Sequence, residues 1–207
     1  MKIALIGATG YVGSPLLLEA LERGHEVTAI VTRPMNLPDH PRLTAVQGDA
    51  TDSSQLAERV AGHDLVISAF NPGRDPNGSG PQAIIDGVKR ADVPRLLVVG
   101  GAGTLKLASG ERVVDQPDFP HEWKEGALRT AAFLDQLRLE PELDWVFLSP
   151  AAMLVPGERT GHYRLGQDEL LLDAHGESRI SLQDYALAML DEAEHPRHHR
   201  QRFTVAY

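Results

Sequence analysis

Short runs of apolar, mostly β-branched or leucine residues recur along the chain, and segments with helical spacing of apolar positions separate them. Six runs have the length of buried strands, and four intervening segments have the pattern of helices. This alternation is typical of βαβ units and of a parallel sheet covered on both faces. The pattern predicts an α/β domain with a doubly wound sheet. The expected strands are 3–6, 27–31, 43–46, 65–69, 96–99 and 145–148, and the expected helices are 16–21, 53–60, 82–90 and 126–139.

The alternation loosens after Pro150, so we expect one domain over residues 1–207 in which 150–207 contributes the substrate side. Two segments between elements, 71–81 and 102–120, are longer than the usual connections of compact domains. Both follow the carboxyl ends of expected strands, where open α/β sheets bind ligands. We predict that they form the rim or lid of a site, and disorder is the alternative.

Composition narrows the classes of function. The 207 residues suffice for one domain, and the net charge of -9 argues against broad binding to nucleic-acid phosphates. The one basic run, 195–200, is expected to be a solvated turn. The absence of cysteine removes disulfides, thiolate catalysis and Cys-ligated zinc, and no metal site is expected. No apolar stretch approaches the roughly 20 residues of a membrane span, and no signal peptide is visible, so we expect a soluble, cytoplasmic protein.

The most informative motif is the glycine-rich segment 7–13, which joins the first expected strand to the first expected helix. Glycines at such a turn let the backbone approach a pyrophosphate, and the helix N-terminus attracts the anion. Pro15 fits the first turn of that helix. The context predicts a Rossmann-type dinucleotide site, with a purely structural turn as the alternative. The expected cofactor contacts here are Gly7, Thr9, Gly10, Tyr11, Val12 and Gly13.

The end of the second strand predicts which dinucleotide is bound. Enzymes that use NAD carry an acidic residue there for the ribose 2′-hydroxyl, whereas this chain has Arg33. A guanidinium suits a 2′-phosphate in shape and charge, so we predict a preference for NADP(H) over NAD(H). A solvated surface arginine is the alternative.

Further cofactor contacts are expected at the ends of the next three strands. Asp49 and Ala50 are placed to contact the adenine, although a turn and helix cap would explain them equally well. Small residues end the fourth and fifth strands, where they permit close approach of the cofactor or, alternatively, tight helix packing. The expected cofactor contacts there are Ala69 and Phe70 after the fourth strand and Gly100 and Gly101 after the fifth.

Six motifs give the chain a family resemblance over nearly its whole length. They are GATGYVG (7–13), VTRP (31–34), GDATD (48–52), LDWVFLSPA (143–151), PGERTGHYRLG (156–166) and SRISLQDYA (178–186). The chain resembles the atypical short-chain dehydrogenases/reductases, specifically the NADH-flavin reductase-like group related to biliverdin-IXβ reductase. The resemblance implies substrate contacts beyond Pro150, with a hydrogen-bonded structural loop as the alternative. The candidates are Met153, Arg159, Thr160, His162 and Tyr163.

The chain departs from catalytic short-chain enzymes because it lacks their Tyr-x-x-x-Lys pair. None of the four tyrosines has a lysine four residues later, and the expected place reads PHEWKE (120–125). A carbonyl acceptor needs a positioned acid, whereas an isoalloxazine or quinone ring delocalises the added charge. No catalytic residue is therefore assigned. The candidates are His121, Lys124 and Tyr163, with Trp123 as part of the substrate wall.

Together these features predict an NADP(H)-dependent reductase of a flavin, a quinone or a related planar acceptor. Two alternatives stay open. One is a cofactor-sensing regulator similar to the nitrogen-metabolite-repression proteins, which bind the dinucleotide without turnover. The other is a sugar-nucleotide epimerase or dehydratase, which the short chain and the missing Tyr/Lys pair disfavour.

Overall fold

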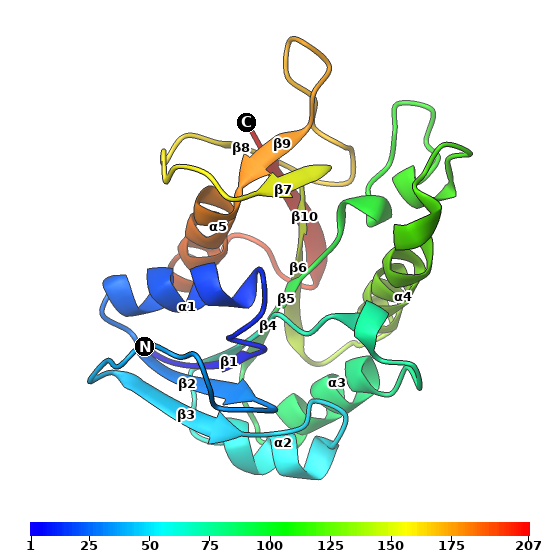
Figure 1. Cartoon of the computed structure of the whole chain (residues 1–207). Coiled ribbons are helices and arrows are strands. Elements are labelled where there is room, and N and C mark those ends of the chain that lie inside the picture. The colour runs from blue at the N-terminus through cyan, green and yellow to red at the C-terminus, as the bar shows by residue number, and fades with distance from the viewer.

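An eight-stranded sheet organises the computed structural model, which describes all 207 residues (Figure 1). Its strand order is β3-β2-β1-β4-β5-β6-β10-β8, and every neighbouring pair is parallel except β10 and β8. This is the predicted Rossmann-type α/β fold. The strands are β1 (Lys2–Ile6), β2 (Glu26–Val31), β3 (Leu43–Gln47), β4 (Leu65–Ser68), β5 (Arg95–Val99), β6 (Asp144–Pro150), β8 (Arg164–Gly166) and β10 (Gln201–Ala206).

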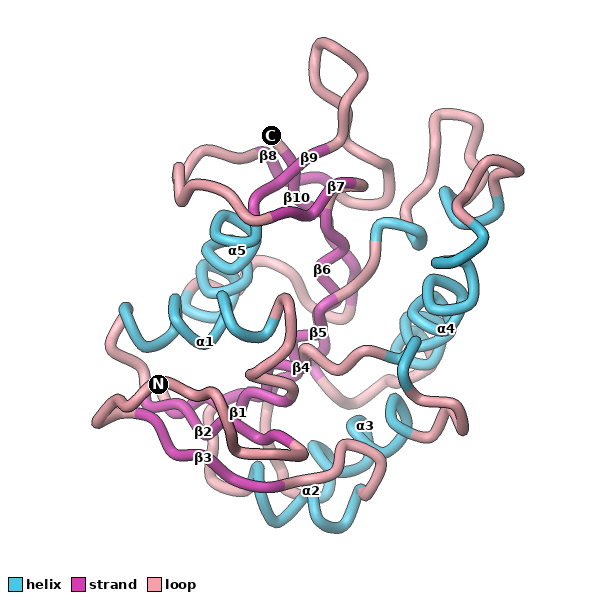
Figure 2. The backbone as a smooth tube through the Cα atoms, in the orientation of Figure 1, coloured by secondary structure: helices cyan, strands magenta, loops and turns pink.

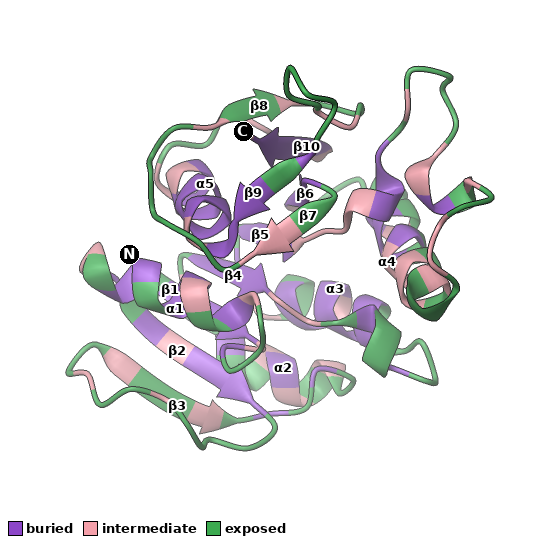
Figure 3. Cartoon of the chain, turned by 45° about the horizontal axis from the view of Figure 1, so that its top comes forward, coloured by how far each residue is buried: buried purple, intermediate pink, exposed green.

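Five helices cover the two faces of this sheet. Helices α1 (Gly13–Glu22) and α5 (Leu182–Glu194) pack on one face, and α2 (Ser53–Val60), α3 (Gly80–Arg90) and α4 (His121–Arg138) pack on the other. Side chains alternate between the faces, because successive residues of a strand point in opposite directions. In β1, Leu5 joins the core with α1 and α5, and Ile6 joins the core with α2, α3 and α4. The inner strands are buried, whereas much of the edge strand β3 is exposed (Figure 3).

The expected elements of the first 150 residues all occur, with one notable difference in a helix. Helix α4 begins at His121, five residues before its expected start at 126. Pro120 directly precedes the helix, and Gly126 lies inside it without interrupting it. The weak helix propensity of glycine costs only about 1 kcal/mol, which packing of the helix offsets. No helix combines the length and the apolar composition needed to cross a membrane.

Most of the segment after Pro150 belongs to the main body of the fold. Helix α5 covers one face of the sheet, and β10 pairs with β6 as a seventh parallel strand. Only a second, two-stranded parallel sheet and its loops stand outside the main sheet, at the top of Figure 1. It consists of β7 (Met153–Val155) and β9 (Arg179–Ser181). Residues after Pro150 thus build part of the main fold as well, and their contribution to the substrate side stays a prediction.

The basic run 195–200 is largely exposed, as expected for a solvated turn, and one of its side chains, His198, is anchored in the protein. Buried Glu192 accepts hydrogen bonds from Arg95 at 2.6 Å and from Nδ1 of His198 at 2.8 Å. The His198 ring stacks on Phe203 of β10, with ring centroids 4.1 Å apart and planes at 5°. At the outer edge of the run, His199 pairs with Asp144 of β6. The run therefore anchors β10 beside β6.

The two long loops differ in structure (Figure 2). Segment 71–81 forms a 3-10 turn, η1 (Pro72–Arg74), and then begins α3. Segment 102–120 contains two further 3-10 turns, η2 (Ala102–Thr104) and η3 (Val113–Asp115). Both loops are folded, which contradicts the alternative of disorder.

Candidate cofactor-binding site

The candidate site lies where the strand order reverses, between the carboxyl ends of β1 and β4. The chain leaves β1 toward β2 and β3 and returns to the other side of β1 at β4, which creates a crevice outside the strand ends. Two adjoining cavities of about 250 and about 320 Å³ occupy this crevice. We call them together the cofactor cleft. Their walls share Gly10, Ala69, Phe70, Asn71 and Arg74.

Glycine is needed at the positions of the first turn for different physical reasons. Gly7 has a φ of +78°, and a Cβ there would lie 2.9 Å from the Ala69 carbonyl oxygen. A Cβ at Gly13 would lie 2.0 Å from the Gly7 oxygen, so both glycines are required by the protein's own backbone. A Cβ at Gly10 would meet only the Gly7 oxygen, at 3.2 Å. Gly10 is exposed and lines both cavities, so its missing side chain leaves space for a ligand.

Helix α1 presents its N-terminus at this space. The residue at its N-cap, Val12, offers no side-chain hydrogen bond to the first helical N–H groups. Uncapped N–H groups and the helix dipole favour an anion, which a dinucleotide pyrophosphate supplies. The turn and the helix end therefore fit the cofactor that the sequence predicts.

The smaller cavity suits the adenosine half of a dinucleotide. Asp49 lies in its wall, and one carboxylate oxygen accepts hydrogen bonds from the Thr51 N–H at 2.9 Å and from its hydroxyl at 2.7 Å. The cap of α2 is instead Asp52, which accepts from two N–H groups at 3.0 Å. The second oxygen of Asp49 has no protein donor and remains available to an adenine amine. The cavity is also lined by Ile6, Gly7, Thr9, Ile30, Val31, Thr32, Gly48 and Ala50.

Arg33 follows directly after Thr32, which lines the adenosine cavity. Its side chain is exposed and takes part in none of the ion pairs of the chain. The guanidinium is therefore free to meet an anion at the cleft edge, as the NADP(H) interpretation requires. The structure does not place Arg33 among the residues that line the cavity.

The larger cavity suits the nicotinamide half, and the titratable side chains in its wall are Tyr11 and Arg74. The Tyr11 hydroxyl donates to the Leu154 carbonyl at 3.2 Å, and the Thr130 hydroxyl donates to the Gly126 carbonyl at 2.9 Å. Their protons are thus engaged with backbone oxygens. The remaining wall consists of Val12, Pro72, Val99 and Gly100, besides the residues common to both cavities.

Gly100 and Gly101 have structural explanations. A Cβ at Gly100 would lie 2.3 Å from the Phe147 ring, and one at Gly101 would lie 3.2 Å from the Thr130 methyl group. Both are packing contacts within the protein, which fits tight packing, the alternative to close approach of the cofactor. Gly100 nevertheless lines the nicotinamide cavity, whereas Gly101 is half-buried behind it.

Helix α4 replaces the Tyr/Lys pair with small side chains on its cleft side. Thr130 faces the cavity, and Gly126 lies one turn earlier on the same face of the helix. A Cβ on Gly73 of η1 would lie 3.0 Å from the Gly126 Cα, so η1 packs directly on α4. The guanidinium of Arg129 donates to the Asp75 carbonyl and joins the same two elements. A Cβ at Gly126 itself would lie 3.5 Å from the Gly73 Cα, which is an ordinary van der Waals contact.

The candidates at the start of α4 do not line the cleft. His121 is exposed, Trp123 is 65% exposed, and Lys124 is half-buried. Met153 of β7 is 50% exposed and also lies outside both cavities. These placements give no support to a contact with a bound dinucleotide, and a role for these residues in acceptor binding stays a prediction.

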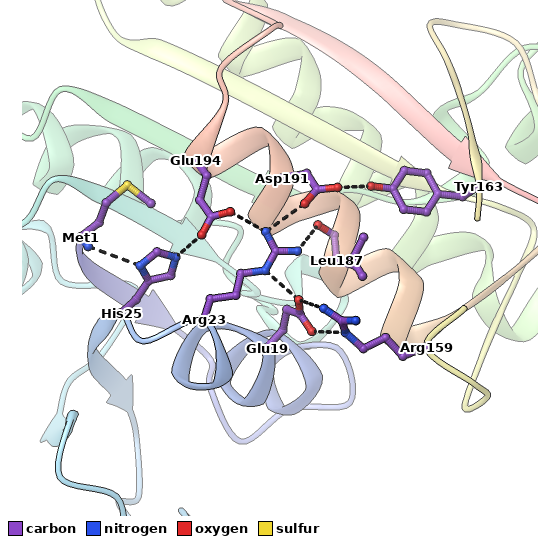
Figure 4. Close-up of polar contacts among 9 residues, drawn as sticks. All are labelled: Met1, Glu19, Arg23, His25, Arg159, Tyr163, Leu187, Asp191 and Glu194. Carbon is purple, nitrogen blue, oxygen red and sulfur yellow. Dashed lines mark hydrogen bonds and ion pairs between the residues drawn. The ribbon is translucent and has the colours of Figure 1, made fainter. Parts of the chain in front are cut away.

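Tyr163 is directed to α5 and lines neither cavity of the cleft, so the structure gives its candidacy as a catalytic residue no support. Its hydroxyl donates to the Asp191 carboxylate (Figure 4). Burial raises the pKa of the Tyr163 phenol above its ordinary value, and the bond to Asp191 adds to this effect. His162 is exposed, and its N–H donates to the Thr160 hydroxyl, which in turn donates to Asp184 at 2.6 Å. These bonds fit the alternative of a structural loop, and a substrate contact by His162 stays a prediction.

Arg159 belongs to a network of ionic contacts between α1, α5 and the loop after β7 (Figure 4). It donates to both oxygens of Glu19, at 2.8 and 2.9 Å, and Arg23 donates to the same carboxylate at 2.7 Å. The bond from Arg159 lowers the pKa of the Glu19 carboxyl, burial opposes this shift, and Arg23 reinforces it. Arg159 is thus held in an ion pair outside the cofactor cleft.

Sequence reasoning missed two polar residues of the cleft, Arg74 and Asn71. Both belong to segment 71–81, which was expected to form a rim, and Arg74 lines both cavities. Its guanidinium is exposed and forms none of the chain's ion pairs. The signal was available, since Arg74 is the one cation of that segment. The other expected rim, 102–120, lines neither cavity.

The site and the fold together define an NAD(P)H-binding Rossmann protein of the atypical short-chain dehydrogenase/reductase type. The chain belongs to the NAD(P)H-binding family, whose model matches residues 7–196. It is 42% identical over 211 residues to uncharacterized protein YwnB of Bacillus subtilis, with 99% of this chain and 98% of the relative covered.

Two solved structures are similar over the full length of the chain. One, from Bacteroides thetaiotaomicron, is named a "putative epimerase"; it has 49% identity and a TM-score of 0.95, covering 100% of this chain and 96% of the other. The second, from Streptococcus pneumoniae, is named a "putative NADH-flavin reductase"; it has 36% identity and a TM-score of 0.88, covering 100% and 99%. The resemblance inferred from the motifs is confirmed at the level of the family.

Proposed function

We propose that the protein is an NADP(H)-dependent reductase that transfers hydride to a flavin, a quinone or a similar planar acceptor. One observation carries this proposal: the nicotinamide end of the cleft is open, yet the hydroxyls in its wall, of Tyr11 and Thr130, are bonded to backbone carbonyls. The name of the Streptococcus relative agrees with the flavin acceptor, although it gives NADH as the cofactor.

The residues of the cleft would bind and orient the cofactor. When bound, a reduced nicotinamide supplies a hydride to the acceptor. The turn at Gly10 and the N-terminus of α1 would hold the pyrophosphate, Asp49 the adenine amine and Arg33 the 2′-phosphate. Arg74 faces both halves of the cleft and would neutralise the pyrophosphate from the opposite wall. The contribution of these residues to the rate is chiefly positioning.

The lack of a free acid favours acceptors with a conjugated ring. Reduction of a simple ketone needs a proton donor of suitable pKa beside the new alkoxide. A quinone or isoalloxazine spreads the charge over its ring system, so solvent can deliver the proton. The same absence weighs against an epimerase, which the name of the Bacteroides relative suggests, because that chemistry would require a Tyr/Lys pair. A cofactor sensor without turnover is the remaining rival.

Substitution of Arg33 tests the cofactor preference. We expect Arg33→Ala to weaken NADP(H) binding by roughly ten- to a hundredfold, the value of one charge-assisted contact, and to leave NAD(H) binding nearly unchanged. Calorimetry with both cofactors measures this difference. Arg74→Ala is the matched control, because a contact with the pyrophosphate should weaken both cofactors equally. Equal weakening by Arg33→Ala, or a wild type that prefers NAD(H), would contradict the assignment.

NADPH oxidation with different classes of acceptor tests the proposed reaction. We expect NADPH oxidation with flavin mononucleotide, riboflavin or a simple quinone, and little with alcohols, ketones or nucleotide sugars. Changing His121, Lys124 or Tyr163 singly should leave residual activity, because none lines the nicotinamide cavity. Anaerobic stopped-flow absorbance at the NADPH band measures each acceptor. Tight NADPH binding without any turnover would identify a sensor, and ketone reduction that vanishes in one of these variants would identify an acid-catalysed dehydrogenase.

A further inference from the structure

A third cavity, of about 580 Å³, adjoins the cofactor cleft on the outer side of α1. We call it the α1 groove. It shares Thr9, Gly10 and Tyr11 with the cleft, so the two adjoin at the glycine turn. Its walls come from the exposed side of α1, the loop after β7 and the start of α5. They include Pro15, Leu18, Pro156 and Leu182.

The α1 groove gathers apolar side chains that the fold leaves in solvent. Tyr11 is 60% exposed and Leu18 is 54% exposed, and neighbouring Pro156 is exposed as well. A single exposed leucine needs no explanation, but apolar groups gathered in a cavity beside a ligand cleft indicate a binding surface. Buried Leu182 completes the wall opposite α1.

The charges of the α1 groove exclude an anionic occupant. Its one cation is Arg159, and both oxygens of Glu19 already accept from that guanidinium (Figure 4). Glu22 is exposed in the same wall and forms none of the chain's ion pairs. A phosphate in this groove would meet a free carboxylate and no free cation. A neutral alkyl chain is not repelled by the Glu22 carboxylate and needs no cation to bind.

We propose that the α1 groove binds the neutral alkyl or isoprenoid chain of a quinone whose ring is reduced at the nicotinamide end of the cleft. This inference rests on the proposed function and narrows its acceptor to tailed quinones. The reaction balances as NADPH plus a proton plus quinone giving NADP⁺ plus hydroquinone. Two electrons pass to the ring as hydride, and solvent supplies the second hydrogen. The alkyl or isoprenoid tail of the quinone takes no part in the reaction and contributes only binding energy.

Two quinones with one ring system test this proposal. The acceptors are 2,3-dimethoxy-5-methyl-1,4-benzoquinone and its 6-decyl derivative, assayed anaerobically with saturating NADPH. We expect kcat/KM for the decyl compound to exceed that for the short compound by about tenfold or more, since each buried methylene contributes favourably. The variant Leu18→Asp places a charge in the groove and should remove this advantage. It should leave NADPH affinity and turnover of the short quinone unchanged.

The control variant is Leu172→Asp, which has the same change at a similarly exposed residue (48%) that does not line the α1 groove. It should keep the full preference for the decyl compound. Equal kcat/KM for both quinones in the wild type, or an undiminished preference in Leu18→Asp, would overturn the tail site. Either result, with the short quinone still reduced, leaves the proposed reductase function in place. Failure of every acceptor would instead refute the function on which the inference rests.

Discussion

Gly10→Val should abolish dinucleotide binding while the protein stays folded. The valine side chain would occupy the space beside the N-terminus of α1, where the backbone must approach the pyrophosphate. Within the protein, a Cβ at Gly10 meets only one carbonyl oxygen, at 3.2 Å, so the native structure needs only a small adjustment. We expect a loss of affinity of roughly a thousandfold or more, measured by calorimetry with NADPH.

The control for this prediction is Gly13→Ala, which should lose stability, whereas Gly10→Val should lose cofactor binding. A Cβ at Gly13 would overlap the Gly7 oxygen at 2.0 Å, so the turn itself cannot form without rearrangement. Thermal unfolding should therefore show a large loss of stability for Gly13→Ala and a small one for Gly10→Val. Undiminished NADPH affinity in a folded Gly10→Val protein would contradict the location of the cofactor site.

Glu192→Ala should cause the largest loss of stability among single substitutions at ionic residues. The Glu192 carboxylate accepts from Arg95, from Nδ1 of His198 and from the N–H groups of Arg197 and His198. Its removal leaves the buried Arg95 guanidinium with no close carboxylate: a hydrogen bond to the His198 carbonyl at 2.9 Å and a 3.6 Å contact to Asp144 remain. Breaking a buried ion pair in this way costs about 3 to 5 kcal/mol. We expect Tm to fall by roughly 10 °C in calorimetry.

An exposed ion pair provides the comparison for Glu192. Glu125 of α4 is 80% exposed and pairs with Arg129 one turn later. Glu125→Ala should change the free energy of unfolding by less than about 0.5 kcal/mol, as is usual for such pairs. Similar losses for both variants would show that the contacts of Glu192 do not anchor β10. NADPH affinity should stay normal in both, because neither residue lines the cofactor cleft.

The parts of the fold and site that could be predicted from sequence are those that local chemistry determines. The first strand, the glycine turn and the first helix follow one another within the chain, and their spacing alone identifies the dinucleotide motif. The strands up to β6 are short apolar runs with clear turn residues between them. Asp49, Ala69 and Gly100 line the cleft as expected, because the ends of parallel strands meet at one edge of a sheet.

The parts that could not be predicted depend on contacts between distant residues. Helix α5 is buried on nearly all sides, so it lacks the one-sided apolar pattern by which a surface helix is found. Tyr163 was placed in the site because of its motif, but its position depends on Asp191, 28 residues later. The role of the run 195–200 likewise depends on Glu192, Asp144 and Phe203, which lie on three different elements.

The position of β10 between β6 and β8 constrains the order in which the sheet can assemble. Strand β8 precedes β10 in the chain, yet β10 is its one strand partner in the sheet. The strand 164–166 therefore has no ladder to join until 201–206 has paired with β6. Closing that pairing spans more than fifty residues, and such long-range pairings form late and slowly. We expect the edge at β8 to be the last part of the sheet to form and the first to open.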